Sequence, residues 1–255
     1  MNASPNSNGK VFLVGAGPGD LGLLTLKAAG LIESAEFIAI DALVSSEIAA
    51  LVPSSTQVVY VGKRSSAHTL PQEEINALLI AEAKKGKRVV RLKGGDPYVF
   101  GRGGEEAEAI VAAGIDVEVV PGISSSIAGP AYAGIPVTHR RCSTSLTIVT
   151  GHEAESSTGI DWPILAQLKG TIVFLMGFAN LDLIARKLIE HGMPPNKPVA
   201  VISKATTPDQ RTVAATLSTI AARVAEENLP TPAIVVVGEV VTLRSQLDRT
   251  LCEVA

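Results

Sequence analysis

One pattern constrains this chain most: a short apolar run, a turn rich in glycine, proline or charged residues, and a helix-like segment, repeated along its first half. The apolar runs have the length of buried strands, and the segments between them are long enough to serve as crossovers. Alternation of this kind predicts an α/β domain with a parallel five-stranded sheet. The expected strands are 11–14, 37–40, 58–61, 89–92 and 117–120.

A second domain is expected after residue 134, where small and rigid residues lead into the basic cluster of 139–141. The sequence thus predicts a loose tail at 1–9, an N-terminal α/β domain at 10–134 and a C-terminal α/β domain at 135–255. Two apolar runs near residue 210 lack a helical crossover between them, so the second sheet should be mixed. Its expected strands are 146–150, 171–176, 198–202, 212–217 and 233–237.

The stretch 89–106, reading VVRLKGGDPYVFGRGGEE, joins a buried-strand pattern directly to a cluster of glycines. A tight turn needs one or two glycines, whereas this cluster spreads across the whole connection to the next helix. We interpret it as backbone packed closely against a ligand. The alternative is an ordinary flexible turn, since glycine clusters also occur there.

Polar residues follow each expected strand of the first sheet. In an open parallel sheet, ligands bind beyond the carboxyl ends of the strands. Each residue taken singly could be a turn or capping residue, and Asp20 could be a helix N-cap. Their coincidence favours a site, with these residues at one edge: Asp20, Asp41, Lys63, Asp96 and Ser124.

The first glycine turn, GAGPGD at 15–20, argues against a nucleotide-binding oxidoreductase, the rival from another functional class. The dinucleotide fingerprint requires a glycine where this chain has Asp20. Pro18 removes an N–H from a loop that would have to donate to pyrophosphate.

Composition excludes several classes of protein. The chain is 46% hydrophobic and 18% charged, which indicates a globular fold, and it has no apolar run of membrane-spanning length. Its first residues lack a signal-peptide pattern, so we expect a cytoplasmic protein without membrane association. The two cysteines and four histidines show no metal-ligand spacing, and a net charge of -3 disfavours nucleic acid as a partner. Any anionic ligand must therefore be bound by a local group of positive charges.

Several long motifs together resemble the tetrapyrrole methylases. The resemblance covers about residues 11–244, and within the family it is closest to the members that act on uroporphyrinogen III. The TPDQR and THRR segments carry that distinction. The motifs are VGAGPGDLGLLTLKA, VGKR, RLKGGDPYVFGRGGEE, PGISSSIAGPAYAGIPVTHR, TGH and PVAVISKATTPDQRTV.

The resemblance implies a two-domain α/β enzyme, usually a homodimer, with S-adenosyl-L-methionine in a cleft between the domains and no metal. It implies two successive C-methylations of uroporphyrinogen III, giving precorrin-2 through precorrin-1 for sirohaem and cobalamin biosynthesis. Relatives that use this cofactor on another substrate remain alternatives: later corrin-pathway methylases, diphthine synthase or a ribosomal RNA methylase. The low pI of about 5.9 disfavours the RNA option.

The resemblance also implies the site residues. Asp41 matches a proposed proton acceptor and Lys63 a proposed proton donor, although Ile40 stands before Asp41 where the family commonly has tyrosine. Met176 lies in an apolar strand pattern and could equally be a core residue. The cofactor would contact Pro18, Gly94, Gly95, Asp96, Val99, Ser124, Ser125, Met176 and Ala205.

These roles suit the chemistry. A sulfonium donor releases a neutral leaving group, so alignment with the pyrrole carbon is the main requirement. Methylation disturbs the conjugation of the macrocycle, so protons must then be moved. If Asp41 and Lys63 face each other, each favours the charged state of the other, and Lys63 is a poor acid unless it is desolvated.

The substrate carries many carboxylates, and an acidic protein must concentrate positive charge where it binds them. Arginine can hold a carboxylate through two hydrogen bonds. Arg64, Arg102 and Arg140 are the preferred candidates because they adjoin glycine or hinge motifs. For each of them, and for Lys63, His139, Arg141 and Arg211, the alternative is a solvated surface charge.

Overall fold

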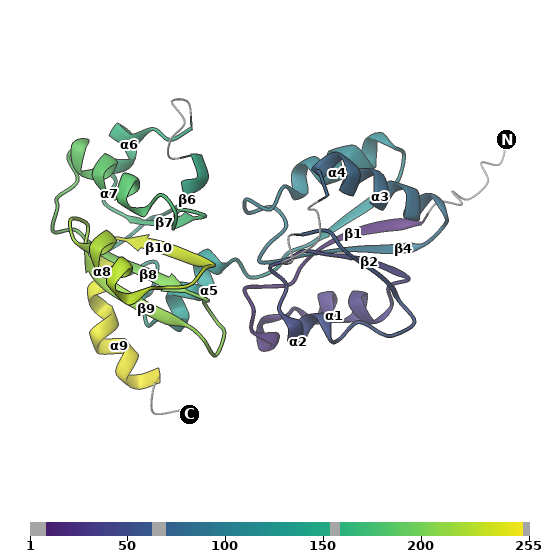
Figure 1. The fold of residues 1–255 in the computed structure, drawn as a ribbon, viewed down its shortest axis with the longest axis horizontal. Helices are drawn as coiled ribbons and strands as arrows, with labels where there is room; N and C mark the ends of the chain where they lie inside the picture. The colour runs from purple at the N-terminus through teal and green to yellow at the C-terminus, as the bar shows by residue number, and fades with distance from the viewer. Residues whose placement is uncertain (1–8, 63–69, 154–158, 252–255) are drawn as a thin grey trace. The chain divides into compact units, whose positions relative to one another are not determined.

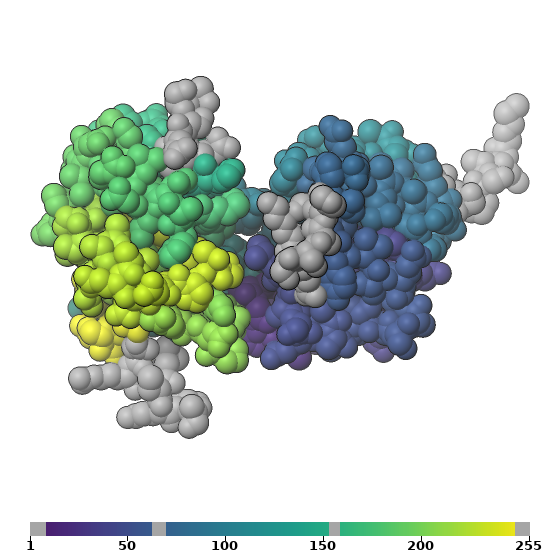
Figure 2. Space-filling view, viewed as in Figure 1, coloured from purple at the N-terminus to yellow at the C-terminus, as the bar shows by residue number. Residues whose placement is uncertain are grey.

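The computed structural model describes residues 9–62, 70–153 and 159–251. The chain divides into two compact units, Met1–Ser124 and Ser125–Ala255, each with its own sheet (Figure 1). The space-filling view shows that the described atoms of each unit form a closely packed body (Figure 2). No helix in this described part is long and apolar enough to cross a membrane.

The first unit contains a five-stranded sheet in which every pairing is parallel. The strand order is β3-β2-β4-β1-β5, so β4 lies at the centre between β2 and β1, and the carboxyl ends of all five strands meet at one edge. The predicted parallel sheet is confirmed. The strands are β1 (Lys10–Gly15), β2 (Phe37–Ile40), β3 (Gln57–Tyr60), β4 (Arg88–Lys93) and β5 (Asp116–Val120).

Helices cover both faces of this sheet (Figure 1). Residues of β1 alternate between them: Phe12 and Val14 pack with α1 and α2, whereas Val11 and Leu13 pack with α3 and α4. Burial on both faces explains why the strands read as continuous apolar runs. The helical segments are η1 (Leu21–Leu23), α1 (Leu26–Glu33), α2 (Ser46–Ala49), α3 (Gln72–Lys84) and α4 (Gly103–Ala112).

The second unit contains a mixed sheet with the order β6-β7-β10-β8-β9. Only the β6–β7 pairing is parallel, and β8 and β9 form the antiparallel pair expected from the missing crossover. The predicted mixed sheet is thus also confirmed. The strands are β6 (Leu146–Thr150), β7 (Thr171–Leu175), β8 (Pro198–Ser203), β9 (Arg211–Thr216) and β10 (Ala233–Val237).

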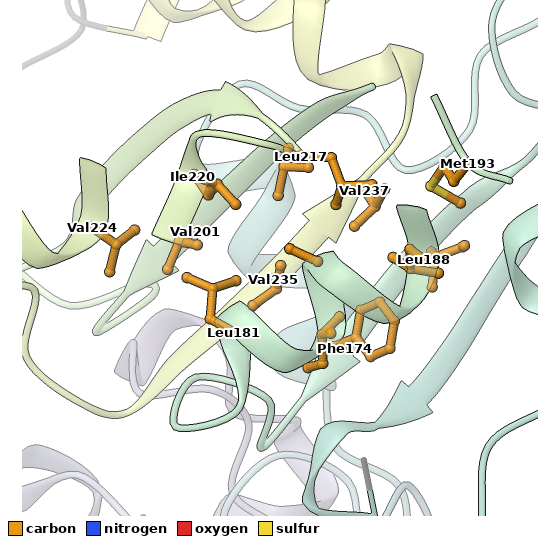
Figure 3. Packing of buried hydrophobic residues seen from close by; sticks show 14 of the residues in the cluster. Phe174, Leu181, Leu188, Met193, Val201, Leu217, Ile220, Val224, Val235 and Val237 are labelled. Atoms are coloured by element: carbon orange, nitrogen blue, oxygen red, sulfur yellow. The ribbon is translucent and has the colours of Figure 1, made fainter. Parts of the chain in front are cut away.

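One apolar core joins this sheet to its helices (Figure 3). Helix α7 buries Leu181, Ile184 and Leu188, whose spacing places them on one face. They pack with Phe174 of β7, whose ring stacks on Trp162 at a centroid distance of 6.5 Å. The helical segments of this unit are α5 (Ser125–Tyr132), η2 (Gly151–Glu153), α6 (Trp162–Gln167), α7 (Leu181–Glu190), α8 (Ile220–Glu227), η3 (Glu239–Leu243) and α9 (Arg244–Leu251).

Helix α5 belongs by its contacts to the second unit. A Cβ added at Gly129 would lie 2.5 Å from Ile234 Cδ1 and 3.1 Å from Ala205 Cβ, so the helix backbone approaches this sheet closely. The division therefore falls before α5, whereas the sequence places the domain boundary after it, at residue 134. A helix that reads as one more crossover is in fact packed on the next sheet.

An ion-pair cluster joins three elements of the first unit and predicts a specific dependence on acid. Glu118 Oε2 lies 2.6 Å from Lys10 Nζ, and Glu118 Oε1 lies 2.5 Å from Lys27 Nζ. Hydrogen bonds from Lys10 and Lys27 lower the pKa of Glu118 from 4.5 to about 2. Because the folded-state pKa is the lower one, this contribution to stability is complete above pH 4.5 and is lost as pH falls towards 2.

We therefore expect Glu118→Gln to destabilise the protein at neutral pH, with a difference from the unmodified protein that shrinks below pH 4.5. Urea unfolding across the acid range measures it. Glu33→Gln is the matched control, because Glu33 is an exposed carboxylate at the end of α1. A difference that stays constant down to pH 2 would contradict the prediction.

Candidate functional site

Two turns of the first unit are joined by backbone hydrogen bonds just beyond the carboxyl ends of β1 and β4. Gly17 and Gly95 form an isolated antiparallel bridge, with N···O distances of 3.1 Å and 2.7 Å. Ala16 N also donates to Lys93 O at 2.7 Å. The GAGPGD turn and the GGD turn at 94–96 are therefore held side by side.

Asp96 ties a third turn, the one after β5, to this pair. Its Oδ2 accepts a hydrogen bond from Gly122 N at 3.1 Å, and its Oδ1 accepts from Tyr98 N at 2.8 Å. A Cβ added at Gly95 would lie 4.0 Å from Ser124 Cα, which places Ser124 beside the GGD turn. Because both carboxylate oxygens bind backbone N–H groups, Asp96 shapes the turns around any ligand.

The glycines of this stretch have a different cause from the one inferred from sequence. A Cβ added at Gly94 would lie 2.7 Å from Leu43 Cβ, and Cβ atoms at Gly101 and Gly103 would lie 2.7 Å and 2.4 Å from Pro97 O. The chain itself excludes side chains at these three positions, so the inference that the cluster requires a ligand is wrong there. Gly95 differs, because its φ of +65° favours glycine.

Asp41 lies at the end of β2, beside β4. Its N donates to Leu92 O at 3.0 Å, and its Oδ1 accepts from Ala42 N at 2.7 Å. Since Ile40 pairs with Leu92, Asp41 lies across from Lys93, and the attraction between the two charges acts on that lysine. The predicted partners Lys63 and Arg64 lie outside the described residues.

Two candidates from the first turn, Asp20 and Pro18, have local structural roles. Asp20 caps η1, with Oδ1 accepting from Gly22 N at 2.7 Å, as the capping alternative predicts. Pro18 is half-buried between Gly17, at φ +76°, and Gly19, at φ +143°. The proline thus stiffens a turn whose flanking positions require glycine.

Strained backbone marks the loop that leads from Asp96 into α4. Phe100 and Arg102 have φ values of +51° and +58°, which side chains other than glycine rarely adopt. Val99 lies between them and the GGD turn, with its N 3.4 Å from Asp96 O. The Arg102 side chain is exposed and lies 3.5 Å from Glu105. Backbone strain of this kind is typical of ligand sites, and no pattern in the residues indicated it beforehand.

Two cofactor candidates of the second unit lie on similarly strained turns. Met176 follows β7 at φ +55° and is 52% exposed, so the alternative that it is a core residue is wrong. Ala205 is buried after β8, between Lys204 at φ +44° and Thr206 at φ +64°. Ser125 is the first residue of α5.

Arg140 is exposed in a polar loop of the second unit. His139 and Ser143 form a bridge with N···O distances of 2.7 Å and 2.8 Å. The loop surrounds an open pocket of about 810 Å³ lined by residues 138–141, 143 and 144. Arg211 instead forms an ion pair with Glu227 at 2.9 Å, as the reading of a solvated surface charge predicts.

A buried charge cluster beneath the GGD turn was missed by the sequence reasoning. Glu106 Oε1 accepts hydrogen bonds from Arg91 Nε at 3.0 Å, Lys93 Nζ at 3.1 Å and Gln72 Nε2 at 3.1 Å. Burial, followed by repulsion from Arg91, lowers the pKa of Lys93. The signal was available, because Arg91 lies within a strand expected to be buried on both faces and Lys93 directly follows that strand.

No group of three or more His, Cys, Asp or Glu side chains in the described ranges could hold a metal ion. The carboxyl edge of the first sheet offers instead backbone N–H and C=O groups on adjoining turns and the carboxylate of Asp41. The buried positive charges of Arg91 and Lys93 lie on β4, just before the GGD turn. Such a surface can hold an organic ligand by backbone contacts and position a proton acceptor beside it.

Comparison with known proteins gives consistent matches. A profile of the Tetrapyrrole (Corrin/Porphyrin) Methylases matches residues 10–221. An S-adenosyl-L-methionine-dependent uroporphyrinogen III methyltransferase of Methanosarcina barkeri is 54% identical over 94% of this chain and 94% of its own. The solved structure of uroporphyrin-III C-methyl transferase from Thermus thermophilus complexed with S-adenyl homocysteine is 41% identical, with a TM-score of 0.77 over 92% of this chain and 100% of that one.

A siroheme synthase of Pseudoalteromonas atlantica is 49% identical over 97% of this chain. The match covers 54% of that enzyme, so the chain spans about half the length of this longer relative.

The close approach of the turns predicts an unequal response to two similar substitutions. A Cβ added at Gly122 would lie 2.3 Å from Gly95 O, whereas one at Gly104 meets no atom within 4 Å. We expect Gly122→Ala to destabilise the protein by about 1–3 kcal/mol because backbone must move. Gly104→Ala, in an open helical position, should instead stabilise it by about 0.5 kcal/mol. Urea unfolding of both variants measures this, and equal stabilities would show that the turns are not tightly packed.

Proposed function

The chain belongs to the tetrapyrrole methylase family, and from this premise we propose that it transfers methyl groups from S-adenosyl-L-methionine to carbon atoms of uroporphyrinogen III. Two successive transfers would give precorrin-1 and then precorrin-2, for sirohaem or cobalamin biosynthesis. The observation that carries the proposal is the 54% identity with the Methanosarcina barkeri enzyme along 94% of both chains.

The proposed cofactor contacts fit the turns that the structure describes. Gly95 adopts a positive φ with only Ser124 Cα, at 4.0 Å, near the place of a Cβ. Met176 is exposed where a core methionine would be buried. S-adenosyl-L-methionine supplies a methyl group on a sulfonium and leaves as a neutral thioether. In the first unit we propose contacts from Pro18, Gly94, Gly95, Asp96, Val99 and Ser124, and in the second unit from Ser125, Met176 and Ala205.

Asp41 is the proposed proton acceptor. Its position past the end of β2 places a carboxylate at the same edge as the proposed cofactor turns, within hydrogen-bonding distance of Ala42 N. A fixed carboxylate there can accept the proton that must leave the macrocycle after methylation. Lys63 is retained as the proposed proton donor from the family resemblance alone.

Positive charge for the carboxylates of the substrate is proposed to come from Arg64, Arg102 and Arg140. The exposure of Arg102 and Arg140 supports this, because a bidentate grip requires a free guanidinium face. A homodimer and a cytoplasmic location are proposed from the family resemblance.

Methyl transfer to uroporphyrinogen III is the direct test of the proposed activity. The protein is incubated with uroporphyrinogen III and S-adenosyl-L-methionine carrying a labelled methyl group, and label in the tetrapyrrole is followed with time. We expect a singly and then a doubly methylated product. Absence of transfer, or transfer only to added RNA, would end the proposal.

Two aspartates are expected to separate binding from turnover. Asp96→Ala removes the acceptors for Gly122 N and Tyr98 N, so S-adenosylhomocysteine affinity should fall by about tenfold or more. Asp41→Ala should leave that affinity within about twofold and lower kcat by about a hundredfold, the scale of a lost general base.

Calorimetry gives the affinities and the methylation assay gives kcat. Asp116→Ala is the matched control, because Asp116 is exposed at the opposite, amino end of β5. Unchanged affinity in Asp96→Ala would show that the cofactor lies elsewhere.

A further inference from the structure

Loop 94–102 connects β4 to α4 and carries five of the proposed site residues: Gly94, Gly95, Asp96, Val99 and Arg102. Its two ends are joined by one carboxylate, Glu106 in the first turn of α4. Glu106 binds both Arg91 and Lys93, the last charged residues of β4 before the loop. The geometry of the loop therefore depends on a contact that lies outside it.

The contact is almost fully removed from solvent. The side chains of Arg91 and Lys93 are each 4% exposed, and that of Glu106 is 0% exposed. Gln72, in the first turn of α3, donates to the same oxygen of Glu106 and also to Asn76 Oδ1 at 3.1 Å. The cluster thus joins β4, α3 and α4 through one oxygen atom. Glu106 Oε2 is buried and has no hydrogen-bond partner among the residues that the structure describes.

Charges in this cluster do not cancel. Arg91 and Lys93 supply two positive charges and Glu106 supplies one negative charge, which leaves one positive charge in surplus. Asp41, after β2, is the further charged group that acts on Lys93, and it attracts the ammonium as Glu106 does. Gln72 of α3 contributes no charge. Removing the charge of Glu106 would leave two repelling cations at a site where desolvation makes each unpaired charge costly.

We propose that Glu106 is a positioning residue that fixes loop 94–102 by neutralising the buried pair Arg91 and Lys93. This inference rests on the proposed function in one respect, since it takes the loop as part of the cofactor site. Its structural part, the anchoring of the loop by charge, can be tested without any ligand.

The first experiment compares Glu106→Gln with Glu108→Gln, a matched control whose carboxylate is exposed on the same helix. Glu106→Gln keeps the shape of the side chain and removes its charge. We expect trypsin to cut after the exposed Arg102 about tenfold faster in Glu106→Gln, because cleavage follows the population of opened loop. Affinity for S-adenosylhomocysteine, measured by calorimetry, should fall by about tenfold or more. The control should match the unmodified protein in both.

The second experiment separates charge from general damage. The double variant Glu106→Gln with Lys93→Met carries one surplus positive charge, as the unmodified protein does. It should recover slow trypsin cleavage and most of the affinity. Raising the pH should likewise slow trypsin cleavage and restore affinity in the single variant Glu106→Gln. Lys93 already has a lowered pKa, and loss of Glu106 removes two influences that raise it, so the ammonium deprotonates more readily.

Each outcome decides a part of the proposal. Cleavage and affinity unchanged in Glu106→Gln would overturn it. If Glu106→Gln loses trypsin resistance and affinity, and neither Lys93→Met nor raised pH restores them, the cause is packing damage and the proposal is also overturned. At each pH the comparison is with the unmodified protein. If the unmodified protein fails to bind S-adenosylhomocysteine, the proposed function fails, while the trypsin measurements still decide whether Glu106 anchors the loop.

Discussion

Close contact between backbone atoms at the carboxyl edge of the first sheet constrains the rest of the site. A Cβ at Gly15 would lie 2.4 Å from Gly122 N and 2.6 Å from Gly95 O, so three turns occupy space that side chains would otherwise fill. The bridge between Gly17 and Gly95 and the hydrogen bond from Gly122 to Asp96 then hold the turns in place. Apart from the Asp96 carboxylate, these contacts are among backbone atoms, so the edge presents N–H and C=O groups whose positions depend little on other side-chain rotamers.

Charge is arranged around this edge in a way that bulk composition does not suggest. The chain carries a net charge of -3, yet the cluster under the GGD turn has one positive charge in surplus and is almost without solvent. A buried charge is screened far less than a surface charge, so its field reaches the turns above it. Arg102, exposed on the loop and 3.5 Å from Glu105, adds a guanidinium that an anionic group can contact. An acidic protein can thus attract a carboxylate-rich ligand locally.

The fold was largely predictable because it depends on the pattern of apolar residues and on whether a helical crossover separates successive strands. Strands β2, β6 and β10 have the expected bounds. Helix α6 was missed, although Asp161 caps it and Pro163 occupies its first turn, which is a recognisable start signal. Of the site, the position of Asp41 at the carboxyl edge of the sheet followed from the parallel strands, whereas its place beside β4 did not. The cause of the glycines did not, because a sequence does not show which atoms a Cβ at Gly94 or Gly103 would meet.

The strained residues show why both units can offer preformed turns. Phe100 and Arg102 follow β4, Met176 follows β7, and Lys204 and Thr206 follow β8, each with a positive φ. A residue held in this way costs on the order of 1–3 kcal/mol and persists only where its surroundings fix it. Buried Ala205 and the closely packed Gly129 provide such surroundings in the second unit, and Glu106 does so in the first. Folding therefore orders the backbone of these turns in advance, and a ligand that binds them loses less free energy to ordering the protein.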